Sequence, residues 1–154
     1  MMEPVRESRD SSIPGRHFRI LMLVTIVLVT AGVAAGAQQS TFTKWVTTAP
    51  AMAGVVGGAC GNGVYAGEIL KYTEGPTTVI EALYHFNGSK HVFSALVHVE
   101  QTGMKAVISG VVSEGWMKGN SVQGEFTQIA TTQSPNGTAF RGTLNILPLV
   151  VASN

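Results

Sequence analysis

The sequence predicts an all-β protein, a small antiparallel up-and-down (meander) β-barrel of about six to seven strands, preceded by an N-terminal hydrophobic signal or anchor helix. Three observations predict this class. Past residue 63, apolar residues alternate with polar ones and do not recur every three or four positions, which is typical of strands. Short turn signals containing Gly, Asn or Pro interrupt these runs. Glycines inside several runs (Gly67, Gly110, Gly124 and Gly142) indicate bulges or sharp bends at barrel corners.

The first 37 residues differ in composition from the rest. Residues 1–19 are polar and basic, and residues 20–37 form an uncharged apolar run of eighteen residues that ends in Ala35-Gly36-Ala37. This order describes a secretory signal cleaved before Gln38. The alternative is an uncleaved anchor, because the run reaches the lower length limit for crossing a bilayer. In both cases the basic n-region stays cytoplasmic, so we expect a secreted or membrane-anchored protein whose C-terminal domain is extracytoplasmic.

The remaining chain is interpreted as one barrel behind a connecting segment. Residues 38–61 are expected to be a linker and glycine-rich entry, with a short strand around 41–47. The barrel domain is expected over residues 62–150. Its strands are predicted at 64–73, 77–86, 89–101, 106–113, 121–131 and 138–150. Closing such a meander removes its exposed edges, and the layout is similar to small exported barrels of the lipocalin, avidin or allene oxide cyclase–dirigent kind. This likeness implies an architecture only, with no activity and no site residue.

The stretch "LYHFNGSKHVF" (residues 83–93) predicts a hairpin. Asn87-Gly88 between two alternating runs favours a type I′ turn, since both central residues of that turn need a positive φ. With these two residues as the loop, Phe86 opposes Ser89 and Tyr84 opposes His91. One face of the hairpin then forms part of the core: Ile80, Ala82, Tyr84, Phe86, His91, Phe93, Ala95, Val97 and Val99.

The same register separates the histidines of the hairpin. His91 lies on the opposite face from His85 and His98. His85 and His98 are themselves roughly 20–26 Å apart along the strands, whereas zinc ligands all lie about 2 Å from one ion. We therefore predict a turn here and no metal site.

Glu68, Tyr84 and His91 are weak candidates for catalytic residues. If Val64 and Tyr72 face the core, these three polar side chains point into one interior, where they could orient a ligand or exchange protons. In the alternative phase of that strand, other residues point inward and Glu68 faces solvent. Tyr84 and His91 would then lie at the barrel mouth with their polar ends in water.

The candidate ligand-binding residues are mostly aromatic. An interior cavity would be lined by Tyr84, Phe86, His91, Phe93, Trp116 and Phe126. Trp116, in the loop "SEGWMKGN", either forms an exposed tip that contacts a ligand or folds back as a lid on the core.

Composition favours binding over chemistry. After residue 37 the chain carries six basic and six acidic residues, evenly spread, so it has no basic stripe for nucleic acid, and membrane contact is expected only through the N-terminal segment. Its single cysteine, Cys60, is expected to be a buried thiol. No recognised catalytic motif is present, and we expect no cofactor and no metal.

The predicted function is therefore that of a non-catalytic binding protein for a small apolar ligand or a surface partner. Two alternatives remain open. One is a barrel isomerase or cyclase that uses interior Glu, Tyr and His side chains. The other is a structural cell-surface protein that associates through open sheet edges.

Overall fold

The computed structural model describes residues 36–149 of the 154-residue chain. Within this range the chain forms eight strands and no helix. The strands are β1 (Gln38–Val46), β2 (Ala51–Gly58), β3 (Gly63–Thr73), β4 (Thr78–Gly88), β5 (Val92–Thr102), β6 (Lys105–Gly115), β7 (Ser121–Ala130) and β8 (Thr138–Ile146). These residues contain no helix that is long and apolar enough to span a membrane. Residues 1–19 and nearly all of the predicted signal or anchor lie outside the described residues.

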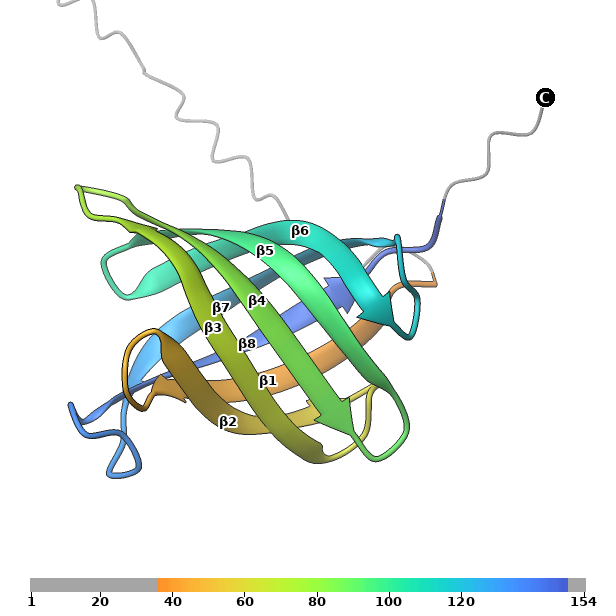
Figure 1. The fold of residues 1–154 in the computed structure, drawn as a ribbon, viewed down its shortest axis with the longest axis horizontal. Coiled ribbons are helices and arrows are strands. Elements are labelled where there is room, and N and C mark those ends of the chain that lie inside the picture. The colour runs from red at the N-terminus through yellow and green to blue at the C-terminus, as the bar shows by residue number, and fades with distance from the viewer. Residues whose placement is uncertain (1–35, 150–154) are drawn as a thin grey trace, which may run out of the picture. The chain divides into compact units, whose positions relative to one another are not determined.

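The eight strands pair antiparallel in sequence order, and β1 also pairs with β8, so the sheet closes into a barrel (Figure 1). The predicted all-β antiparallel meander barrel is confirmed, but with eight strands instead of six or seven. Every strand of the described chain has a neighbour on both sides. The open sheet edges that the structural alternative requires are therefore absent from residues 36–149.

Residues 38–61, where we predicted a linker and a glycine-rich entry with a short strand around 41–47, form two full strands. Strand β1 overlaps the short strand that was predicted, whereas β2 was not predicted. The sequence of β2, "AMAGVVGG", has little side chain to indicate a strand, since Gly and Ala are depleted in strands. This segment is a strand because it pairs with β1 on one side and with β3 on the other.

The hairpin between β4 and β5 has a longer loop than Asn87-Gly88 alone predicts. Phe86 pairs with Phe93 and not with Ser89, and the Gly88 amide donates to the His91 carbonyl at 3.1 Å. The loop between β2 and β3 explains the change, because its Cys60 carbonyl accepts hydrogen bonds from the Lys90 and His91 amides at 3.0 Å. The displacement is an even number of residues, so the predicted core face is correct although the register is wrong.

The predicted bulges are also displaced. Register shifts occur at Ile69/Lys71 and at Ser94/Ala95, not at the mid-strand glycines. At Gly110, Gly124 and Gly142 a Cβ atom would lie only 2.0–2.2 Å from a carbonyl oxygen of the neighbouring strand. These glycines allow close approach of backbone to backbone in a regular ladder.

The barrel has two different ends. We call the end formed by the β2–β3, β4–β5 and β6–β7 loops the closed end; it lies to the right in Figure 1. There Phe86 stacks on Phe93 with ring centroids 4.7 Å apart, and Cys60 is fully buried, as predicted for this thiol. We call the opposite end, formed by the β1–β2, β3–β4, β5–β6 and β7–β8 loops, the open end. The two ends therefore offer different environments to a ligand.

Candidate functional site

A cavity of about 230 Å³ enters the barrel from the open end. Its residues come from every strand except β6, and most are apolar. The lining is Lys44, Val46, Met52, Ile69, Tyr72, Thr78, Ile80, Ala82, Tyr84, Gln101, Phe126 and Phe140. Its volume lies below the roughly 300 Å³ at which pockets for drug-sized molecules begin, so an occupant must be small or must extend out of the mouth. The interior of an eight-stranded barrel is just wide enough to be filled by side chains or to hold one small ligand.

Lys44 is the unexpected member of this lining. Alternate residues of β1 face inward, and Phe42 and Lys44 share that face. As a result, Lys44 is only 4% exposed, although lysine is almost never fully buried without a partner. The strand thus carries a primary amine into the interior of the barrel.

Aromatic rings surround the Lys44 amine. Its Nζ lies 4.0 Å from the ring centroid of Tyr84 and 4.7 Å from that of Phe126, with Phe42 at 5.7 Å and Phe140 at 6.0 Å. Such contacts stabilise an ammonium group, in part, through the ring quadrupole. Lys44 also donates a hydrogen bond to the Tyr84 hydroxyl. Among residues 36–149, no carboxylate lines the cavity or forms an ion pair with this amine.

Burial decides the protonation of these groups. Desolvation lowers the pKa of Lys44 from 10.5 to about 7, because the charged amine loses its water without gaining a counter-ion. Burial raises the pKa of Tyr84, which therefore keeps its proton at neutral pH. Burial and the neighbouring Tyr84 raise the pKa of Tyr65. At neutral pH the interior therefore offers an amine that is readily deprotonated beside a phenol that keeps its proton.

Two of the predicted ligand-binding residues line this cavity, and four do not. Tyr84 and Phe126 form part of its wall. Phe86 and Phe93 pack at the closed end, where they are 0% and 1% exposed. His91 and Trp116 also lie there, stacked on each other with ring centroids 3.9 Å apart and an interplanar angle of 8°. Trp116 therefore folds back onto the core, as in the second of the two alternatives above.

Glu68 does not join Tyr84 and His91. Strand β3 takes the alternative phase, in which Tyr65 and Ile69 point inward and Glu68 is exposed on the outside. Tyr65 rather than Val64 then belongs to the core, because a one-residue change of phase exchanges the two faces of a strand. Tyr84 is fully buried and His91 lies in the β4–β5 loop, so these two are not at one mouth either. The interior carboxylate of the enzyme alternative is therefore absent from the described chain.

The sequence contained one signal for Lys44 that is easy to miss. Lys44 has the same parity as Phe42 and Val46 within "QSTFTKWV", so an inward Phe42 implies an inward lysine. Thr41, Thr43 and Trp45 offer an equally good alternation, and a charged residue is ordinarily assigned to the wet face. Only the closure of β1 against both β2 and β8 decides the phase.

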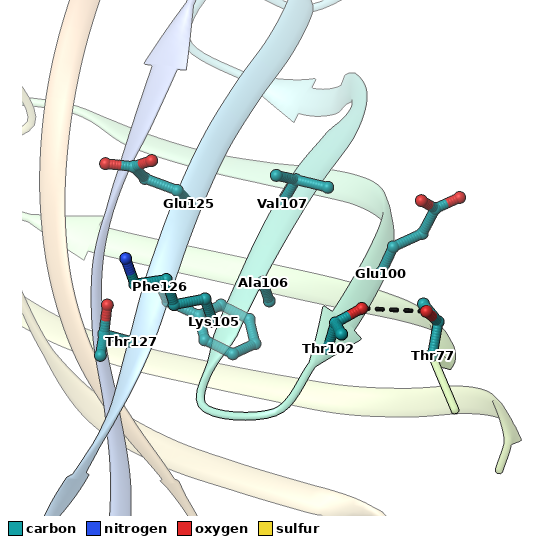
Figure 2. Close-up of a pocket in the computed structure, with 9 residues that line it drawn as sticks. All are labelled: Thr77, Glu100, Thr102, Lys105, Ala106, Val107, Glu125, Phe126 and Thr127. Carbon is teal, nitrogen blue, oxygen red and sulfur yellow. Dashed lines mark hydrogen bonds between the residues drawn. The ribbon is translucent and has the colours of Figure 1, made fainter. Parts of the chain in front are cut away.

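A second hollow lies on the outer face of the barrel, beside β5, β6 and β7 (Figure 2). Glu100, Val107 and Glu125 border it as exposed side chains, and the Thr77 and Thr102 hydroxyls hydrogen bond at 2.9 Å at one side. All polar side chains that line it are exposed, and none of the residues in it is a buried unpaired polar group. No group of three His, Cys, Asp or Glu residues in the described chain is arranged to hold a metal ion. The open-end cavity is therefore the better candidate site.

Comparisons with known proteins do not assign a function to this site. No protein-family model matches the chain, and the searches of curated proteins and of solved structures find no significant match.

Proposed function

We propose that this chain is an exported binding protein for a small, largely apolar molecule that enters the barrel at the open end and places one polar group against Lys44 and Tyr84. The observation that carries the proposal is the pairing of a buried amine with a buried phenol inside an otherwise apolar cavity. Apolar walls with one or two convergent polar groups are the usual design of a small-molecule site. The polar pair would set the orientation of the ligand, and the rings would bury its apolar part.

The mouth of the cavity is compatible with entry. Tyr72, which is 56% exposed, lies at this mouth with the half-buried Thr78 and Gln101. The closed end offers no comparable route, because Phe86, Phe93 and Cys60 are fully buried beneath its loops. A ligand therefore has one direction of approach within the described barrel.

Native mass spectrometry of the full chain, purified from the host that produces it, tests this proposal. A retained molecule of small mass is expected, and its release on denaturation would identify its chemical class. Thr78→Trp, which places a large ring at the mouth, should abolish retention, whereas Glu125→Gln on the outer face should not. Retention that is unchanged in Thr78→Trp would show that the molecule binds elsewhere.

A further inference from the structure

We propose that Lys44 holds its ligand covalently, as a Schiff base, so that the molecules taken up by the cavity are small apolar aldehydes. The inference rests on the proposed binding function and adds the substrate class and the bond. Its geometric basis is an amine that is buried, lines a cavity open to solvent, and is hydrogen-bonded to the Tyr84 hydroxyl. A lysine desolvated in an apolar pocket is a typical carbonyl nucleophile.

The surroundings of Lys44 leave its amine available to a carbonyl. Lys44 lies among Tyr84, Phe126, Phe42 and Phe140 with no acidic residue in the cavity lining, so no negative charge in the free protein holds the amine in its charged form. Burial in such surroundings disfavours the charged form of an amine. An aldehyde reacts with the neutral form, which this environment supplies.

The reaction needs no partner beyond the aldehyde. The neutral Nζ attacks the carbonyl carbon, a C–N bond forms, and the oxygen accepts a proton from the Tyr84 hydroxyl to give a carbinolamine. The nitrogen then loses a proton, which restores the Tyr84 hydroxyl, and the carbinolamine oxygen leaves as water with a proton from solvent. Loss of the second nitrogen proton to solvent leaves a neutral imine. The balance is one aldehyde and one amine giving one imine and one water, with no change of oxidation state.

The titratable groups facing Lys44 are tyrosines. Tyr84 comes from β4, Tyr65 lies behind it on β3, and Tyr72, also on β3, is at the mouth. The neighbours from β2, β5, β7 and β8 do not titrate: Met52, Gln101, Phe126 and Phe140. The pKa of Lys44, lowered to about 7, therefore sets the pH at which imine formation rises.

Reductive trapping with hexanal tests the inference. The full chain is incubated with hexanal and sodium cyanoborohydride, digested, and examined for a hexyl group on each lysine by mass spectrometry. We expect trapping at Lys44 to exceed that at Lys105, an exposed lysine at the same end of the barrel, by at least about tenfold at pH 7. The rate at Lys44 should rise with pH to a plateau just above 7, whereas an ordinary exposed lysine continues to gain neutral amine up to about pH 10.

Variants separate the site from general amine chemistry. Lys44→Met should remove the dominant adduct and leave the minor ones, and Lys105→Met should leave the Lys44 adduct unchanged. Tyr84→Phe should slow trapping at Lys44 without abolishing it. Equal labelling of Lys44 and Lys105 in folded protein would overturn the proposal, and circular dichroism of each variant verifies that the fold is intact.

Hexanol and hexanoate distinguish failure of this inference from failure of the proposed function. Both are titrated against the full chain by isothermal calorimetry. Binding of hexanol without trapping of hexanal would overturn the covalent bond and leave the binding function in place. Tighter binding of hexanoate, again without trapping, would assign the cavity to carboxylates. No binding of hexanol or hexanoate, with no hexanal adduct at Lys44, would overturn both proposals.

Discussion

Lys44 is the residue at which folding and the proposed function conflict. Burial of an amine without a carboxylate destabilises the folded chain, because the ammonium loses hydration that the four neighbouring rings restore only in part. Apolar replacements of buried ion pairs are often neutral or stabilising, and Lys44 lacks even the partner charge of such a pair. The folded protein thus gives up stability at the position where the cavity gains its polar group.

Lys44→Met is therefore expected to raise the free energy of unfolding at pH 6–7, by roughly 1–4 kcal/mol. Urea denaturation measures this change. Lys105→Met, at an exposed position, is the matched control and should stay within about 0.5 kcal/mol of the parent protein. A destabilised Lys44→Met protein would mean that the lysine–tyrosine hydrogen bond outweighs the cost of desolvation.

The pH dependence of stability provides a second test of Lys44. Its pKa is about 7 in the folded chain, against 10.5 for a lysine side chain in water, so between these values the unfolded chain binds more protons. Stability is then expected to rise with pH from 7 to 9, by up to about 1.4 kcal/mol per unit. The rise should disappear in Lys44→Met. The measurement is limited to pH 9, because ionisation of tyrosine in the unfolded chain opposes the effect at higher pH.

The pKa of His98, on the outer surface, shifts in the opposite direction to that of Lys44. Its pKa is raised, first by the hydrogen bond between Nδ1 and Glu81 at 2.6 Å and second by that between Nε2 and Glu100 at 3.3 Å. Glu81→Gln should therefore lower the pKa of His98 more than Glu100→Gln does, as measured by NMR titration of the imidazole protons. Glu125→Gln, on β7, is the control. The stabilisation by this cluster is present at low pH and is lost as pH rises through the pKa of the folded state.

At the scale of elements, glycines allow the backbones of neighbouring strands to approach each other closely. A Cβ at Gly142 would lie 2.0 Å from the Glu125 carbonyl oxygen and 2.7 Å from the Phe126 Cβ. An alanine therefore fits at this position only if the β7 backbone moves. Gly142→Ala should destabilise the protein by at least about 2 kcal/mol in thermal or urea denaturation.

Gly75 in the β3–β4 turn is the matched control for this prediction. A Cβ there would meet only the Thr77 carbonyl oxygen at 3.4 Å, which is an ordinary contact. Gly75→Ala should therefore change stability by less than about 0.5 kcal/mol. Equal effects of the two substitutions would show that β7 and β8 have more room than their pairing implies.

At the scale of the whole molecule, the two ends of the barrel are expected to respond separately. Trp116 covers the closed end, with its ring 6.1 Å from that of Phe93 and stacked on His91. Trp116→Ala should lower stability by about 1–2 kcal/mol, less than the roughly 3–5 kcal/mol of a fully buried tryptophan, because Trp116 is only half-buried. Its trapping of hexanal at Lys44 should match that of the parent protein. Loss of trapping in a folded Trp116→Ala protein would show that the two ends are coupled.

The sequence predicted the strands that carry alternating, β-branched or aromatic residues and failed where those side chains are missing. Core positions such as Tyr84, Phe86 and Phe93 were assigned to the correct face, because a period of two has only two phases and the aromatic residues select one. In β2, small residues carry no such information. In β3, apolar residues occupy both faces, with Val64 and Leu70 outside and Tyr65 and Ile69 inside, so alternation could not choose between them.

By itself, the sequence determined that this chain is an antiparallel β meander, because alternation and turn residues are local properties encoded over a few positions. The tertiary structure alone decided the number of strands, the register of the β4–β5 hairpin, the end of the barrel that is filled, and the burial of Lys44. Each of these depends on contacts between residues distant in the chain: β1 with β8, the β2–β3 loop with the β4–β5 loop, and Lys44 with Tyr84. A lysine becomes a candidate nucleophile only when a closed barrel removes its water, and no local pattern in the chain reports that closure.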